Sequence, residues 1–190
     1  NAATLDYTGT TGDTSNRQFS VTAGSAGTIK ASNAGFTDLT LSGAISNLGS
    51  GLTLDVTAGT LTETGVISGS GTLTKTGTGT LYLNQAASSY TGQTTIGRGT
   101  VQVSKLAAGG SNSSLGATAA GTAIVLGDGT NAATLNYTGT TGDTSDRQFS
   151  VTAGSAGTIR ASNAGFTDLT LSGAISNLGS GLTFDVTAGT

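Results

Sequence analysis

The sequence contains no cysteine, histidine, proline, methionine or tryptophan. Without cysteine and histidine there is no disulfide, no Ser–His–Asp triad, no cysteine nucleophile and no ordinary zinc site. Because proline is absent, every residue has the backbone N–H that a buried strand requires. These absences argue against the commonest catalytic and metal centres, and they suit an extended β structure.

Charge is also scarce. Only 9% of the residues are Asp, Glu, Lys or Arg, against roughly 25% in typical globular proteins, which argues against a disordered polyelectrolyte. The net charge of −3 comes with no basic stripe, so nucleic acid is not an expected partner. Residues 1–190 contain no run of about 18 apolar residues, so no transmembrane segment is expected within them.

An internal repeat dominates what is present. Residues 131–190 repeat residues 1–60 with only four differences, which are Asp6/Asn136, Asn16/Asp146, Lys30/Arg160 and Leu54/Phe184. The chain therefore contains one complete repeat, 1–130, and the first part of the next, 131–190. Self-similarity at a fixed period is typical of repeat arrays, so we interpret the chain as a segment of a longer array. We expect the Lys30/Arg160 site to be exposed and the Leu54/Phe184 site to face inward.

Short runs with a period of two recur along the whole chain. Each places Leu, Ile, Val, Phe or Tyr on one side and Thr, Ser or a charge on the other, which is typical of strands, and Gly, Asn, Asp and Ser separate them as turns require. No segment keeps the apolar spacing of a helix, and we expect residues 106–120 to form a loop. The predicted strands are 3–7, 18–22, 27–31, 38–42, 52–56, 71–75, 79–83, 99–103 and 123–126.

Starts of the form Gly-Thr-aliphatic recur at Gly27, Gly71, Gly79 and Gly99. Grouped by coil, they lie roughly 20–25 residues apart, within the range of solenoid repeats. The pattern predicts an all-β, parallel β-solenoid with about six coils per repeat, continuous from 1–130 into 131–190, lengthening by roughly 29 Å per repeat. An array of β-sandwich domains has a similar strand spacing but requires linkers, and a propeller usually carries aromatic signatures that are absent.

Residues 65–103 read GVISGSGTLTKTGTGTLYLNQAASSYTGQTTIGRGTVQV. This segment resembles the autotransporter-associated β-strand repeat, also called the passenger-associated transport repeat. The residues that match the first half of that motif are Gly71, Leu73, Thr74, Lys75, Gly77, Gly79, Thr80, Leu81 and Leu83. Those that match the second half are Tyr90, Thr91, Gly92, Thr94, Ile96, Gly99, Thr100 and Val103. Val101 stands where the motif usually has Leu. The resemblance implies a right-handed parallel β-helix in a bacterial protein that is secreted or held on the outer cell surface, with no catalytic residue in the motif.

Site candidates are few. Asp55 and Glu63 suggest a carboxylate pair on an outer sheet, although such a pair is more often a solvated face. The turns 127–131 and 11–14, which contain Asp128 and Asp13, are oxygen-rich enough to suggest calcium, although Asp and Gly usually serve the turn itself. Lys75 is interpreted as a solvated residue that discourages edge pairing.

Two further surface features have a functional and a structural interpretation. An aromatic strip of Tyr7, Phe19, Phe36, Tyr82 and Tyr90 suggests carbohydrate binding, against the simpler interpretation that these rings fill the core. Residues 112–114 form a glycosylation sequon, a pattern with a high false-positive rate.

The sequence therefore predicts a non-enzymatic protein without catalytic residues, metal or cofactor. We expect a rigid stalk or filament segment of a bacterial surface or secreted protein, whose neighbours are other repeats of the same chain. The alternatives are a shaft that binds glycans or cells and a shaft that associates laterally into fibres, which identical repeats make geometrically easy.

Overall fold

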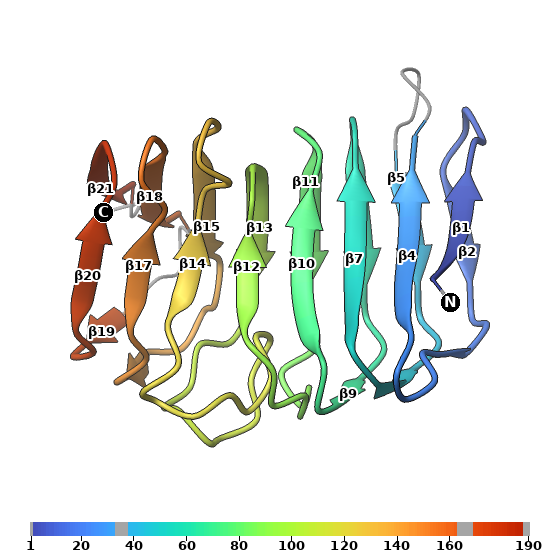
Figure 1. The fold of residues 1–190 in the computed structure, drawn as a ribbon, viewed down its shortest axis with the longest axis horizontal. Helices are drawn as coiled ribbons and strands as arrows, with labels where there is room; N and C mark the ends of the chain where they lie inside the picture. Colours follow the sequence, from blue (N-terminus) through green and yellow to red (C-terminus); the bar gives the residue numbers. More distant parts are fainter. Residues whose placement is uncertain (1, 33–37, 163–168, 188–190) are drawn as a thin grey trace.

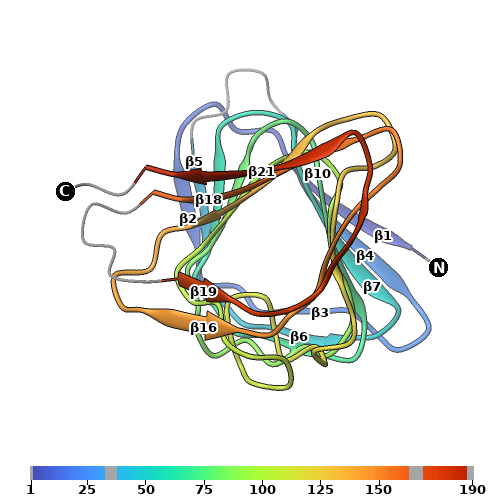
Figure 2. The ribbon, with the colours of Figure 1, turned by 90° about the vertical axis from the view of Figure 1, so that its left-hand side faces the viewer.

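The computed structural model describes residues 2–32, 38–162 and 169–187. The described residues form strands and loops without a helix, and every strand pairing is parallel. The chain winds as a solenoid whose cross-section has three sides (Figures 1 and 2). Seen from the C-terminal end, the chain runs anticlockwise as it approaches the viewer, so the solenoid is right-handed (Figure 2). The predicted right-handed parallel β-solenoid is therefore confirmed.

Two of the three faces are eight-stranded sheets that run the length of the molecule. The first face consists, in order, of β1 (Ala3–Tyr7), β4 (Ala26–Ala31), β7 (Gly51–Val56), β10 (Thr72–Thr76), β12 (Thr94–Ile96), β14 (Ile124–Leu126), β17 (Phe149–Val151) and β20 (Ile175–Leu178). The second consists of β2 (Asp13–Ser15), β5 (Asp38–Leu41), β8 (Thr60–Glu63), β11 (Thr80–Leu83), β13 (Gly99–Val103), β15 (Ala133–Tyr137), β18 (Ala156–Ala161) and β21 (Gly181–Val186).

The third face is less regular. It begins with β3 (Phe19–Ser20), β6 (Ile45–Leu48) and β9 (Ile67–Gly69), and it ends with β16 (Asp143–Ser145) and β19 (Leu169–Leu171). Between them, residues 88–91 lie on β9 through the bonds from Ser89 N to the Ile67 oxygen and from Thr91 N to the Gly69 oxygen, both 2.9 Å. Residues 104–120 follow as a long loop, where a loop was predicted.

Alternation of side chains builds the core. One inward column of the first face contains Ile29, Leu54, Ile96 and Leu126 from successive coils. The residue before each of them in its strand, usually Thr, points outward. Leu54 is completely buried, as expected. Its counterpart Phe184 occupies the same inward position in β21, but it is 55% exposed because no described coil covers it. Burial therefore comes from the neighbouring coil, as in other solenoids.

The repeat does not contain a whole number of coils. Its fourteen strands, β1–β14, together with the segments 88–91 and 104–120 make sixteen sides of a three-sided coil. One repeat is therefore five and one third coils, slightly fewer than the expected six. With coils about 4.8 Å apart, the shaft lengthens by about 26 Å per repeat.

Glycines allow successive coils to approach closely at the corners. A Cβ on Gly92 would lie 2.1 Å from the carbonyl oxygen of Gly71 in the preceding coil, so a larger residue cannot fit there without backbone movement. Gly77 adds a second reason, because its φ of +77° favours glycine.

Candidate functional site at the repeat junction

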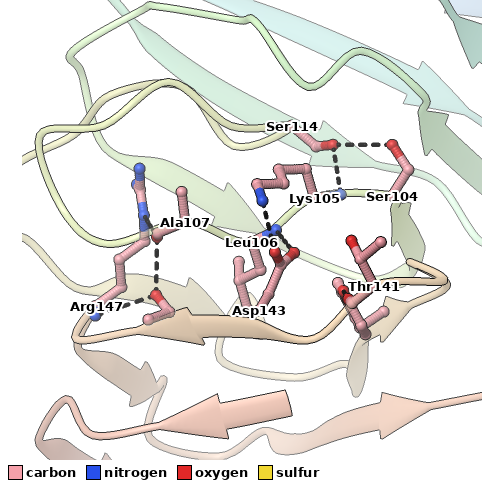
Figure 3. Close-up of polar contacts among 10 residues, drawn as sticks. Ser104, Lys105, Leu106, Ala107, Ser114, Thr141, Asp143 and Arg147 are labelled. Carbon is pink, nitrogen blue, oxygen red and sulfur yellow. Dashed lines mark hydrogen bonds and ion pairs between the residues drawn. The ribbon is translucent and has the colours of Figure 1, made fainter. Parts of the chain in front are cut away.

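The most elaborate polar arrangement lies where one repeat ends and the next begins. The loop 104–120 closes the third face of one repeat, and β16 with the residues after it opens the third face of the next. Four charged side chains connect the two, and we call them the junction cluster: Lys105, Asp143, Asp146 and Arg147. Figure 3 shows three of them, Lys105, Asp143 and Arg147.

Arg147 is the centre of this cluster and is only 1% exposed. Its Nε donates to the carbonyl oxygen of Ala107 at 3.1 Å, and its Nη2 donates to those of Ser111 at 3.2 Å and Gly116 at 2.7 Å. Its Nη1 donates to the carbonyl oxygen of Leu115 at 3.3 Å. The planar guanidinium thus satisfies carbonyl groups along the whole loop, a task for which its several donors suit it.

Asp143 holds the start of the same loop (Figure 3). Its Oδ1 accepts from Lys105 Nζ at 2.7 Å, and its Oδ2 accepts from the backbone N–H of Leu106 at 2.8 Å. The side chain of Asp143 is 2% exposed and that of Lys105 is 40% exposed. The carboxylate of this ion pair is therefore buried, whereas the lysine side chain is partly exposed to water.

Asp146 completes the contact, and it is one of the four positions that differ between the copies. Its Oδ1 accepts from the N–H of Gly109 at 2.7 Å. Asn16, the equivalent residue of the first copy, is exposed and lies in a coil over which the described residues place no such loop.

The two copies show what the loop contributes. Arg17 and Arg147 lie in nearly identical sequences, yet Arg17 is exposed and Arg147 is buried. The same holds for Asp13 and Asp143. The loop of the preceding repeat is the difference, so the cluster forms only where two repeats meet.

The chemistry of the cluster is that of a structural contact. Two cations and two carboxylates balance, and the guanidinium donors end on backbone carbonyls. Among the described residues, no buried side-chain nitrogen or oxygen lacks a hydrogen-bond partner, and no group of three or more Asp, Glu, His or Cys could hold a metal ion. Sequence reasoning missed this site, although the loop at 106–120 and the variable position Asp146 were visible signals.

Lys75 is not the solvated residue that we expected. It is 1% exposed and continues the inward column between Leu54 and Ile96. Its Nζ donates to the carbonyl oxygens of Thr76 at 2.6 Å and Gly77 at 2.8 Å, which gives the buried ammonium partners at the corner. Burial lowers the pKa of Lys75 to about 8, although nearby Asp55 opposes the shift.

Asp55 and Glu63 do not form a pair on an outer sheet. Asp55 points outward from the first face, where its Oδ1 accepts from the Thr76 hydroxyl at 3.0 Å. Glu63 points inward from the second face, between Leu41 and Leu83, and is 1% exposed. Its Oε1 accepts from the N–H of Gly65 at 2.7 Å. Burial raises the pKa of Glu63 to about 8, against the opposing effect of that bond.

The two turns considered for calcium use their carboxylates locally. Asp128 Oδ1 accepts from the N–H groups of Thr130 at 3.0 Å and Asn131 at 2.8 Å, and these bonds lower its pKa. Asp13 accepts from the hydroxyl of Tyr7. These contacts support a turn-stabilising role for both carboxylates.

The four described residues of the expected aromatic strip, Tyr7, Phe19, Tyr82 and Tyr90, do not form one exposed row. Tyr90 is completely buried and its hydroxyl contacts that of Thr94 at 2.8 Å. Tyr82 faces outward from β11, Tyr7 and Phe19 are half-buried against the core, and Phe36 lies outside the described residues. In the sequon, Asn112 is exposed, but Ser114 is buried and accepts a bond from the Lys105 N–H at 3.1 Å. No helix among the described residues is long and apolar enough to cross a membrane.

Comparisons with known proteins find one family and one curated relative of similar sequence. Residues 73–103 match the model of the passenger-associated-transport-repeat family. The chain is 40% identical over 118 residues to the Adhesin BmaC autotransporter of Brucella suis biovar 1 (strain 1330), in an alignment that covers 60% of this chain and 3% of that protein. The chain thus spans a small part of the curated relative it matches. No solved structure matches the chain. The resemblance to an autotransporter passenger repeat is confirmed by the two matches.

Proposed function

We propose that this chain, which carries an autotransporter passenger repeat, is a segment of a rigid, non-enzymatic shaft on a bacterial surface. The observation that carries the proposal is the way in which one repeat passes into the next. Strand β13 of the first repeat pairs directly with β15 of the second, from Gly99↔Ala133 to Val103↔Tyr137, so one sheet crosses the boundary. A linker between separate domains would interrupt that pairing.

The junction cluster supports the same role. It adds side-chain bonds from Arg147, Asp143 and Asp146 to the backbone pairing at the point where the regular third face is interrupted. A boundary held by a sheet and by buried polar contacts resists bending, whereas a flexible linker does not. The named relative is an adhesin, which fits a shaft that carries a binding element away from the cell.

Electron microscopy of arrays with two, four and eight repeats tests the proposal. We expect straight rods that lengthen by about 26 Å per added repeat. Beads joined by flexible segments, or an increment that differs clearly from this value, would contradict a continuous shaft. Side-by-side bundling of the rods would show that lateral association accompanies the spacer role.

A substitution makes the test specific to the junction. Replacing Arg147 and its equivalents by Met in an eight-repeat array removes the centre of the cluster at every boundary. We expect rods that bend or break at intervals of one repeat, because the third face there depends on that side chain. Straight, unchanged rods would mean that the sheets alone hold the repeats in line.

A further inference from the structure

Nearly identical stretches of sequence lie on different faces of this solenoid. In the first copy, β1, β4 and β7 belong to the first face; their equivalents β15, β18 and β21 belong to the second face. The pairing between neighbouring coils is nevertheless unchanged, since Ala3↔Gly27 in the first copy corresponds to Ala133↔Gly157 in the second. Local structure is conserved while its position around the axis moves on by one face.

The other strands move in the same direction. Strands β2 and β5 lie on the second face, and their equivalents β16 and β19 lie on the third. Strands β3 and β6 lie on the third face, and their equivalents β17 and β20 lie on the first. The cause is arithmetic: a repeat of sixteen sides wound on a three-sided coil leaves one side over.

We infer that an array of these repeats presents each repeat's outer surface one face further around the shaft than the repeat before it. The array inferred here rests on the proposed shaft function; the shift between the two copies does not. Relative to the sheets, the same surface returns to the same face only after three repeats, or sixteen coils. The sheets also twist gradually along the axis, as stacked strands do. Seen from the C-terminal end, this twist runs clockwise toward the viewer, opposite to the step from face to face, so it makes the net rotation per repeat smaller than one third of a turn (Figure 2).

One charged column shows the consequence. Asp6, Lys30 and Asp55 are registered neighbours on the outside of the first face. Their equivalents Asn136, Arg160 and Asp185 lie in a column on the outside of the second face. In the two preceding coils the same column contains Tyr82 and Gln102. Arg160 Nε donates to Asp185 at 2.7 Å there. Any partner that recognises a surface of the repeat, including another shaft, would thus find it on more than one side, and the shaft would have no single binding side.

Disulfide mapping on this 190-residue chain tests the shift itself, and the chain has no cysteine of its own. Gln102 and Asn136 are registered neighbours on the second face, so the Q102C/N136C variant places two Cα atoms about 4.8 Å apart, within bridging range. Thr95 and Val125 are neighbours on the first face and supply the positive control T95C/V125C. The matched negative variant is T95C/N136C, which places one cysteine on the first face and the other on the second face.

We expect mild oxidation to consume both thiols in Q102C/N136C and in T95C/V125C and to leave them free in T95C/N136C. Circular dichroism confirms that each variant keeps its strands. Bridging in T95C/N136C, or its absence in Q102C/N136C while the positive control bridges, would overturn the inference. These outcomes do not depend on rod length, so failure here is distinguishable from failure of the shaft proposal.

Labelling of longer rods tests the display. Ala86 is exposed at the corner after β11, so Ala86→Cys in every repeat of a seven-repeat rod supplies one label site per repeat. With a gold label on each thiol, tomography should show labels that wind around the rod at a constant angular step, about 26 Å apart along it. A single row of labels along one side would overturn the inference.

Discussion

Arg147 Nη2 donates to the carbonyl oxygen of Gly116 at 2.7 Å, across the boundary between one repeat and the next. The first residue belongs to the opening coil of the second repeat and the other to the closing loop of the first. The bond is one of several by which a single side chain holds the seventeen-residue loop 104–120, which contains no strand. It therefore identifies the position at which the stability of the junction is most sensitive to a single substitution.

Replacing Arg147 by Met should lower the free energy of unfolding by about 3 kcal/mol, because it leaves several buried carbonyl groups without donors. Urea denaturation followed by circular dichroism measures the change. Arg17→Met is the matched control, since Arg17 has nearly the same sequence around it but is exposed, and it should change stability by less than about 0.5 kcal/mol. Equal effects of the two substitutions would contradict the assigned role of the loop.

Glu63 should make the protein less stable as the pH rises from about 4.5 to about 8. Its pKa is raised to about 8 in the folded chain, so over this range the folded state retains a proton that the unfolded state has released, and stability falls with pH. Glu63→Gln should remove most of this slope, which we expect to amount to a few kcal/mol in total. Asp55→Asn, which changes an outward carboxylate, should leave the slope in place. A Glu63→Gln variant with the slope of the wild type would show that Glu63 ionises freely in the folded state.

Lys75 should have the opposite effect at higher pH. Its folded-state pKa is lowered to about 8 from 10.5, so between these values the unfolded chain binds the extra proton and stability rises with pH. Together with Glu63, this predicts a stability minimum near pH 8, measurable as the urea midpoint at a series of pH values. Lys75→Met should abolish the rise above pH 8, and Lys30→Met, at an outward position of β4, should retain it. A midpoint that stays constant from pH 8 to 10 in the wild type would contradict the prediction.

Gly92→Ala should destabilise the solenoid by about 2–3 kcal/mol, because the new Cβ would lie 2.1 Å from the Gly71 carbonyl oxygen and the two coils would have to separate. Gly121→Ala is the control, since no atom lies within 4 Å of the position of its Cβ. Thermal unfolding of the two variants distinguishes loss of coil contact from a general effect of alanine. A Gly92→Ala variant as stable as Gly121→Ala would show that the corner is looser than the structure indicates.

The predictions at Lys75 and Glu63 also show where sequence reasoning stopped short. Both residues continue a strict alternation, Leu73 to Lys75 and Leu61 to Glu63, and the period of two places them inward with the leucines. The sequence interpretation of Lys75 as a solvated residue and of Glu63 as lying on an outer sheet follows the usual exposure of charged side chains, and for both residues it is wrong. The alternation was the better guide, since the backbone cannot turn one side chain outward without disturbing the whole strand.

The repeat, the solenoid class and nine of the fourteen strands β1–β14 were predicted from the sequence, because a period of two and a period of 130 residues are properties of the chain alone; the short strands β2, β6, β8, β9 and β12 were not predicted. The face on which each strand lies was not readable in the same way. It depends on the number of sides between one copy and the next, and residues 88–91 and 104–120 form two sides without a strand signal. Only the folded chain shows that those segments complete a coil, because their position depends on the coils they pack against. Residues 88–91 bond to β9, and the loop 104–120 binds Arg147 of the following repeat.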